Sequence, residues 1–452
     1  MTKPFDTRRP ARHAARFLAL PALIGASLAL SACGGKDRPS TPTVGKREPI
    51  LSRIASQIEP DPALTSTSVV VPAPHENDEW SQPGGNAANN PGNLAFTDTP
   101  SRAWTAKIAG SSNKARLAAA PVIANGMLFV EDTDGVIHAF NAQNGDKIWS
   151  HNFAGKGDKR SVLFGGGVSY FEGRVYATNG AGEVAALDAK TGQEIWKVQP
   201  AGPLRGSPTV AFNAIYVMTQ DNQILALDMK DGSGVWQDFG ASGQSGVFGV
   251  AAPAAGQSTV VAGYSTGELV AYRYENGRNL WSDALARTSI STEVGTLTDV
   301  DADPIIDNGR VYALGQGGRM AAYELVTGQR IWELTIAGIS TPVVAGEWIF
   351  TLTDHAQLLA IARSSGKIRW MTELKRWKNP DKRKNAIFWT GPVLANNKLW
   401  VASSRGEVMT VDIANGTATR FTELGDGVSL PPVLANKTLY ILDDGGTITA
   451  WR

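Results

Sequence analysis

ALDAKTGQEIW, residues 186–196, is one of seven related segments that recur along a chain of 452 residues. Each segment ends in an aromatic residue, and successive ends lie 38 to 51 residues apart, at Trp149, Trp196, Trp236, Trp281, Trp332, Trp370 and Phe421. Periods of this size are typical of propeller blades. Each repeat also holds three short apolar runs separated by turn dipeptides such as Asn125-Gly126 and Asn308-Gly309, which favour tight hairpins. With the aromatic strand they predict an all-β fold of four-stranded antiparallel blades.

The number of repeats predicts a closed ring of eight blades. Seven repeats are complete, and an eighth ends after three strands at Arg452. Residues 101–108, SRAWTAKI, resemble the missing fourth strand but follow no blade of their own. We therefore expect this N-terminal strand to complete the eighth blade, so that no sheet edge stays exposed between the first and last blades. The tryptophans are interpreted as residues that fill the seams between adjacent blades.

Composition excludes several classes of function. The chain has 43 Lys and Arg against 42 Asp and Glu, a net charge of +1, so it lacks the clustered positive charge that nucleic-acid binding needs. A single cysteine forms neither an internal disulfide nor a Cys-rich zinc site. The five histidines include no HExxH motif, and no CxxCH haem motif occurs. These patterns offer no zinc or haem site, and we expect no metal and no cofactor.

The N-terminus has the pattern of an export signal. Four arginines precede an apolar run at residues 17–29, which is too short to span a membrane. Leu30-Ser31-Ala32-Cys33 follows and resembles the lipobox of bacterial lipoproteins, where the cysteine is acylated and becomes the mature N-terminus. Gly34, rather than Asp, favours the outer membrane by the lipoprotein sorting rule. The alternative is an uncleaved anchor with an incidental cysteine.

These observations divide the chain into three parts. Seven prolines between residues 36 and 79 indicate an extended tether. The predicted domains are a lipoprotein signal peptide at 1–32, a lipidated Pro-rich tether at 33–79 and an eight-bladed β-propeller at 80–452.

Two features resemble known families. The AxDxxTGxxxW pattern of residues 186–196 is similar to the repeat of quinoprotein (PQQ) propellers, which include enzymes and non-enzymes. The stretch STEVGTLTDVDADP at 291–304, followed by NGRVYAL, resembles the BamB family of lipoprotein propellers, and the resemblance extends from about residue 101 to residue 452. It implies a non-enzymatic scaffold of the β-barrel assembly machinery. Such a scaffold faces the periplasm, is held to the outer membrane by acyl chains, binds BamA, and assists the folding and insertion of unfolded β-barrel clients.

The same resemblance implies partner-binding residues in two loops, and the candidates are Asp299, Asp301, Thr292, Glu293, Val247 and Phe248. Asp299 and Asp301 match the family's binding aspartates, and if the segment is extended both carboxylates project to one side. The family's second contact, a Leu-x-Leu-Arg-Gly loop one blade earlier, aligns with SGVFG at 245–249 and lacks its arginine. An aromatic contact by Phe248 is the hypothesis there.

The acidic run at 299–303 alternates like a calcium loop. Pro304 and Arg310 stand where such a loop needs glycine and a bidentate glutamate, so an EF-hand is excluded. The aspartates either bind a partner or are merely solvated.

A basic cluster lies in the long segment between Trp370 and Phe421. Around Trp377 it gathers Lys375, Arg376, Lys378, Lys382, Arg383 and Lys384. We interpret it either as a solvated loop or as a contact with anionic headgroups or an acidic partner.

Two rival classes of function stay open for the whole chain. One is a periplasmic quinoprotein dehydrogenase, which would bind PQQ with calcium. The other is a general envelope protein-binding propeller that has no part in barrel assembly.

Replacing Cys33 with alanine tests the predicted anchor. The variant should remain unprocessed or be released into the periplasm, because no other segment is apolar enough to hold the chain at a membrane. Cell fractionation followed by immunoblotting measures the distribution. Tight outer-membrane association of Cys33→Ala that withstands a high-salt wash would contradict the lipoprotein assignment.

Overall fold

The computed structural model describes residues 58–153, 165–204, 206–241, 251–285 and 299–452. The chain divides into two compact units, 1–56 and 57–452, and every described residue belongs to the second. Within the described ranges, no helix has both the length and the apolar character needed to cross a membrane.

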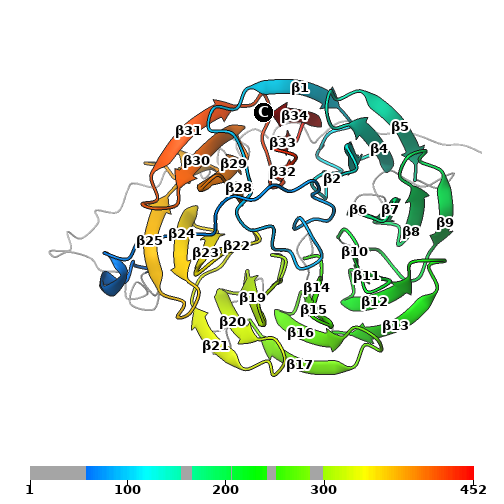
Figure 1. Cartoon of the computed structure of the whole chain (residues 1–452), viewed down its shortest axis with the longest axis horizontal. Helices are drawn as coiled ribbons and strands as arrows, with labels where there is room; N and C mark the ends of the chain where they lie inside the picture. The colour runs from blue at the N-terminus through cyan, green and yellow to red at the C-terminus, as the bar shows by residue number, and fades with distance from the viewer. Residues whose placement is uncertain (1–57, 154–164, 205, 242–250, 286–298) are drawn as a thin grey trace, which may run out of the picture. The chain divides into compact units, whose positions relative to one another are not determined.

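Eight four-stranded antiparallel sheets follow one another around a ring, as the sequence predicts (Figure 1). The first four blades are β2 (Val122–Ala124), β3 (Met127–Glu131), β4 (Val136–Asn141) and β5 (Lys147–Asn152); β6 (Gly166–Phe171), β7 (Arg174–Asn179), β8 (Val184–Asp188) and β9 (Glu194–Val198); β10 (Thr209–Ala211), β11 (Ala214–Met218), β12 (Gln223–Asp228) and β13 (Gly234–Phe239); and β14 (Ala254–Gly256), β15 (Thr259–Gly263), β16 (Glu268–Arg273) and β17 (Asn279–Ala284).

The other four blades are β18 (Ile305–Asp307), β19 (Arg310–Gly315), β20 (Arg319–Glu324) and β21 (Arg330–Leu334); β22 (Val343–Ala345), β23 (Trp348–Leu352), β24 (Gln357–Ala362) and β25 (Ile368–Glu373); β28 (Trp389–Ala395), β29 (Lys398–Ser403), β30 (Glu407–Asp412) and β31 (Ala418–Glu423); and β32 (Val433–Ala435), β33 (Thr438–Leu442), β34 (Thr447–Trp451) and β1 (Arg102–Lys107). A separate two-stranded sheet, β26 (Trp377–Asn379) and β27 (Lys384–Ala386), lies between the sixth and seventh blades along the chain.

The N-terminal strand closes the ring. β1 pairs with β34 in antiparallel register, with Trp104 opposite Ala450. The main chains of Ser101 and Arg452 exchange two hydrogen bonds, of 2.6 and 2.9 Å. The predicted completion of the eighth blade by residues 101–108 is therefore confirmed, and the last blade has no unpaired outer edge.

Each recurring tryptophan joins its blade to the next one. Its indole N–H donates to a main-chain carbonyl of the next blade at 2.7 to 3.2 Å. The acceptors are Ala142, Ala189, Met229, Tyr274, Leu325, Arg363 and Ile413, for Trp104, Trp149, Trp196, Trp236, Trp281, Trp332 and Trp370 in that order. The indole ring lies against the glycine of the same turn, as in Trp149 against Gly192. The tryptophan and glycine of the repeat are therefore two halves of one contact between neighbouring blades.

The contact between the seventh and eighth blades lacks the tryptophan hydrogen bond, and the sequence has no tryptophan at this position. The chain's C-terminus and β1 meet in the eighth blade, so that blade has no turn between its third and fourth strands. Phe421 replaces the tryptophan of the preceding blade and packs edge-on against Trp400 and Trp451, with ring centroids 5.1 and 5.0 Å away. Phe421 has no N–H group to donate, and the eighth blade has no turn whose carbonyl could accept a hydrogen bond.

Residues 58–97, which we call the strap, lie against the blades. Figure 1 shows this segment winding across the middle of the ring. Its main chain hydrogen-bonds to the innermost strands. Trp80 and Ile123 exchange two hydrogen bonds, and the N–H of Leu94 donates to the carbonyl of Leu394. The carbonyl of Ala87 accepts from the N–H of Ala255. Val69 packs in the core cluster that contains Ala345 of the sixth blade. Residues 58–79, placed in the tether by their composition, are thus part of the strap.

Substituting Gly192 tests the seam. An alanine Cβ at this position would lie 2.6 Å from atoms of the Trp149 ring, which forces the ring or the turn to move. We expect Gly192→Ala to lower the free energy of unfolding by about 3 kcal/mol, as overpacking adds to the cost of a left-handed residue. Urea unfolding followed by far-UV circular dichroism measures the change.

Gly126→Ala is the matched control. Gly126 has the same φ of +72° as Gly192, but no atom lies within 4 Å of the added Cβ. It should lose only about 1 kcal/mol, the cost of the backbone conformation alone. Equal losses in the two variants would show that the tryptophan contact does not constrain this glycine.

Candidate functional site

The propeller has two different faces, because each blade begins and ends at the same end of its sheet. The linkers between blades gather on one face, which we call the linker face. The hairpins between the first and second strands of each blade lie on the other, the hairpin face, where the strap crosses. The predicted partner-binding residues fall in two successive linkers, 240–253 and 285–304. Of these residues, Val247, Phe248, Thr292 and Glu293 lie outside the described ranges, whereas Asp299 and Asp301 are described.

The segment that carries the two aspartates is anchored in the core. Val300 is fully buried, and its side chain fills the space that a Cβ on Gly263 would need. The main-chain N–H of Val300 donates to the Tyr264 carbonyl at 3.2 Å. Asp299 is only 2% exposed, whereas Asp301 is partly exposed. Asp301 is therefore the more exposed residue of the pair.

Asp303, two residues further on, ties three linkers together. Its carboxylate accepts the N–H of Ala252 at 2.7 Å, in the preceding linker. Its own N–H donates to the hydroxyl of Thr341 at 3.0 Å, in the following linker. Burial raises the pKa of Asp303 to about 6, although the hydrogen bonds from Ala252 and Thr341 act in the opposite direction. Sequence alone marked Asp303 only as part of an acidic run, because a contact between linkers leaves no local signal.

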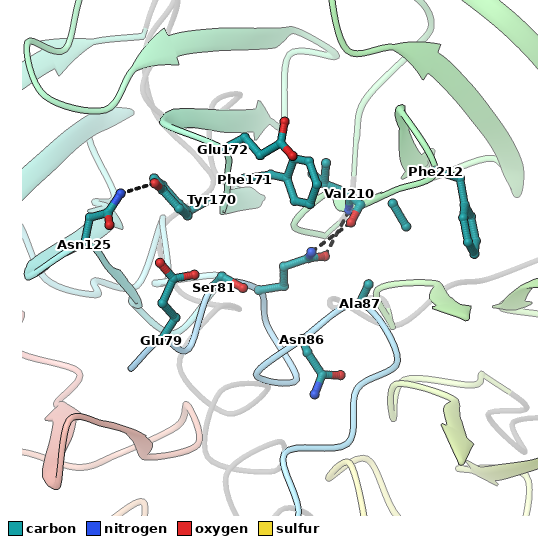
Figure 2. Close-up of a pocket in the computed structure, with 12 residues that line it drawn as sticks. Glu79, Ser81, Asn86, Ala87, Asn125, Tyr170, Phe171, Glu172, Val210 and Phe212 are labelled. Carbon is teal, nitrogen blue, oxygen red and sulfur yellow. Dashed lines mark hydrogen bonds between the residues drawn. The ribbon is translucent and has the colours of Figure 1, made fainter. Parts of the chain in front are cut away.

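A second candidate site is a hollow of about 600 Å³ on the hairpin face (Figure 2). It lies between the strap and the first hairpins of the second and third blades, and its lining includes Glu79, Gln82, Asn86, Asn125, Tyr170, Phe171, Glu172 and Phe212. Gln82 fixes the floor through two hydrogen bonds of 2.9 Å with the main chain of Val210. The lining has two carboxylates, three aromatic rings and no Lys or Arg, which suits a basic or amide-bearing side chain.

The sequence departs from the repeat at two hairpin turns that line this hollow. The positive-φ position of the first hairpin is asparagine in the first, fifth, seventh and eighth blades (Asn125, Asn308, Asn396 and Asn436). The second and third blades have Glu172 and Phe212 there, at φ of 45° and 53°. Neither residue favours the left-handed region as asparagine does. These departures from the repeat are visible in the sequence, but only the structure shows that both side chains line one hollow.

Histidine and acidic groups do not form a metal centre in the described part of the chain. His138 and Asp132 pair through Nε2 and Oδ2 at 2.7 Å. Burial works to raise the pKa of Asp132, but the hydrogen bonds from His138 and from the main chain of Val136 and Asp134 outweigh it and lower the pKa. This pair stabilises the turn between β3 and β4.

The chain was compared with known proteins by sequence. The family model described as "Outer membrane protein assembly factor BamB" matches residues 88–160 and 133–372. BamB of Escherichia coli strain K12 is 27% identical over 354 residues, which cover 77% of this chain and 88% of that protein. BamB of Yersinia pestis is 24% identical over 358 residues, covering 78% of this chain and 89% of the relative.

Solved structures show the same fold. The crystal structure of BamB from Moraxella catarrhalis superposes with a TM-score of 0.63 at 18% identity, over 78% of this chain and 100% of that one. Quinohemoprotein alcohol dehydrogenase from Comamonas testosteroni superposes with a TM-score of 0.62 at 14% identity, over 83% of this chain and 80% of the dehydrogenase. At these identities the likenesses establish the propeller fold alone.

Asp303→Asn tests the link between linkers through the pH dependence of stability. Because the folded pKa of Asp303 lies above the unfolded value, stability from this group is fully present below about pH 4 and is lost as pH rises through 6. Asparagine stays neutral and still accepts from Ala252. The decline in unfolding free energy between pH 4 and 7 should therefore be about 2 kcal/mol smaller in the variant, measured by urea unfolding.

Asp426→Asn provides the control, since Asp426 is an exposed aspartate in another linker. It controls for the loss of one carboxylate as such, and Asp303→Asn should change the slope of stability against pH more than this control does. An unchanged slope in Asp303→Asn would mean that Asp303 is not held in a buried position.

Proposed function

Because the chain belongs to the family of the outer membrane protein assembly factor BamB, we propose that it is a non-enzymatic scaffold of the β-barrel assembly machinery. It binds BamA and assists the folding and insertion of β-barrel clients. The observation that carries the proposal is on the linker face, where residues 299–304, the described end of the motif at 291–304, are anchored in the core through Val300. A scaffold needs such a fixed surface because ordering a loop during binding costs affinity.

BamA binds the linker face in this proposal. Asp301 is a partly exposed residue beside the anchored Val300, and in this proposal its carboxylate binds a basic side chain of BamA's periplasmic domains. Thr292, Glu293, Val247 and Phe248 belong to the same two linkers and complete the contact. Asp299 and Asp303 act as positioning residues, since Asp299 is buried and Asp303 ties the neighbouring linkers together.

In this proposal the N-terminal segment determines where the protein is located in the cell. Acylation at Cys33 anchors the chain in the outer membrane, and the propeller faces the periplasm. The propeller carries no cofactor chemistry in this role, and the likeness to quinohemoprotein dehydrogenases concerns the fold alone.

Asp301→Asn tests the BamA surface. Loss of one rim carboxylate should weaken binding of BamA's periplasmic domains about tenfold, chiefly through a slower association that depends on salt. Surface-plasmon resonance at two salt concentrations measures both rates. The melting temperature should stay within about 1 °C, because a surface substitution seldom changes stability by more than about 0.5 kcal/mol.

The matched variant is Asp426→Asn, which removes the same charge from a distant linker on the same face. It should bind as the parent does. If Asp301→Asn also binds as the parent does, with its fold intact, Asp301 is not part of the contact.

A further inference from the structure

A basic hairpin projects from the linker between the sixth and seventh blades. We use this name for residues 375–388, which contain β26 and β27 joined by the pair Trp377 and Ala386. The hairpin carries six Lys and Arg and one acidic residue, Asp381. All six cations are exposed. The role proposed above makes no use of this charge.

The base of the hairpin is fixed to the propeller. Ile387 is buried, and its N–H donates to the Arg376 carbonyl at 2.9 Å. The indole N–H of Trp389 donates to the Lys375 carbonyl, also at 2.9 Å. Leu374, Ile387 and Trp389 belong to the core cluster of the sixth and seventh blades. The cations are thus presented on a firmly held support.

The charge of the hairpin is not neutralised within the described residues. No ion pair between them involves a Lys or Arg of the hairpin. Arg376 acts electrostatically on the carboxyl of Asp354: desolvation raises the pKa of Asp354, and the charges of His355 and Arg376 lower it in part. Like charges held together without partners repel one another, so the cluster gains when an anionic surface approaches.

Aromatic groups accompany the cations. The Arg376 guanidinium lies over the Trp377 ring, 5.5 Å from its centroid. Phe388 is 69% exposed at the foot of the hairpin, an unusual degree for a phenylalanine in a protein with a packed core. Cations next to tryptophan and phenylalanine suit the interface of a phospholipid bilayer, where phosphates meet the first apolar carbons.

The strap reaches the propeller at the blade from which the hairpin projects. The main-chain N–H of Asp61 donates to the Ile368 carbonyl at 2.7 Å, and its carboxylate pairs with Lys367 at 2.8 Å. Ile368 begins β25, and β25 leads directly into the hairpin. Only 24 residues separate Cys33 from Ile58, and they span at most about 85 Å. If Cys33 is acylated, as proposed above, this length sets an upper limit on the distance between the membrane and Ile58.

We propose that the basic hairpin binds the anionic phospholipid surface of a membrane. The lysines and arginines contact headgroup phosphates, while Trp377 and Phe388 enter the interface. Each cation contributes roughly fivefold in affinity for an anionic bilayer. The hairpin thereby supplies a second attachment that fixes the orientation of the propeller, which an acyl chain on a tether does not fix.

The test uses a chain that begins at Gly34 and carries no lipid, so its outcome does not depend on the proposed anchor. This chain keeps every described residue. Its binding is measured by co-sedimentation with vesicles of mixed phosphatidylglycerol and phosphatidylethanolamine, and with vesicles of phosphatidylcholine alone. We expect binding only to the anionic vesicles, and binding that weakens as salt is raised.

Two variants with the same change in net charge separate the hairpin from the rest of the surface. One replaces Lys378, Lys382, Arg383 and Lys384 with glutamine. The other replaces Lys147, Lys190, Lys230 and Arg278 with glutamine. These exposed cations lie in or directly beside the turns between the third and fourth strands of their blades, at the hairpin face. We expect at least a roughly tenfold loss of vesicle affinity in the first variant and less than about a twofold change in the second, with unchanged melting temperatures.

Three results would overturn the proposal: no binding of the parent chain to anionic vesicles, equal losses in the two variants, or hairpin-dependent binding of an acidic peptide such as poly-glutamate without binding to vesicles. BamA binding is measured on the same two variants. If both bind BamA as the parent does, a failure at the vesicles leaves the proposed scaffold role intact.

Discussion

The propeller depends on one recurring contact, in which a tryptophan of each blade packs against a turn glycine of the next blade. It combines an indole hydrogen bond to a main-chain carbonyl with a ring packed where any side chain on the glycine would stand, as with Trp281 and Gly328. The contact recurs at seven seams and fixes how one sheet follows the next. Only the seam beside the chain ends differs, because no turn is present there to receive an indole. The tryptophan and the glycine recur in the sequence because each pair makes the contact between two neighbouring blades.

This origin explains why the ring could be predicted from sequence. A contact that recurs with each blade leaves a periodic signal, so the number of blades and the closing role of residues 101–108 followed from counting. The strap could not be predicted in the same way. Trp80, Leu94 and Phe96 are buried, but they are single apolar residues in a Pro- and Asn-rich stretch. They pack in a core cluster with residues of the first, seventh and eighth blades, which lie elsewhere in the sequence. Composition alone made the first part of the strap look like a tether.

At the linker face, too, the sequence predicted only part of what the structure shows. The motif around Asp299 and Asp301 was visible, but the alternation of its residues did not reveal that Val300 enters the core beside Gly263. That insertion leaves Asp299 buried and Asp301 partly exposed. The role of Asp303 was also hidden, since it depends on contacts with two other linkers. Sequence thus located the segment, and packing decided which of its two aspartates is more exposed.

In the proposed function the two faces of the propeller have different roles. The strap crosses the hairpin face, whereas the linkers are free to carry the partner surface and the basic hairpin on the other face. Hydrogen–deuterium exchange of the chain, alone and with the periplasmic domains of BamA, tests this division most directly. The account predicts new protection in linkers 240–253 and 285–304. Protection confined to the hairpin face, at the turns of Glu172 and Phe212, would contradict it.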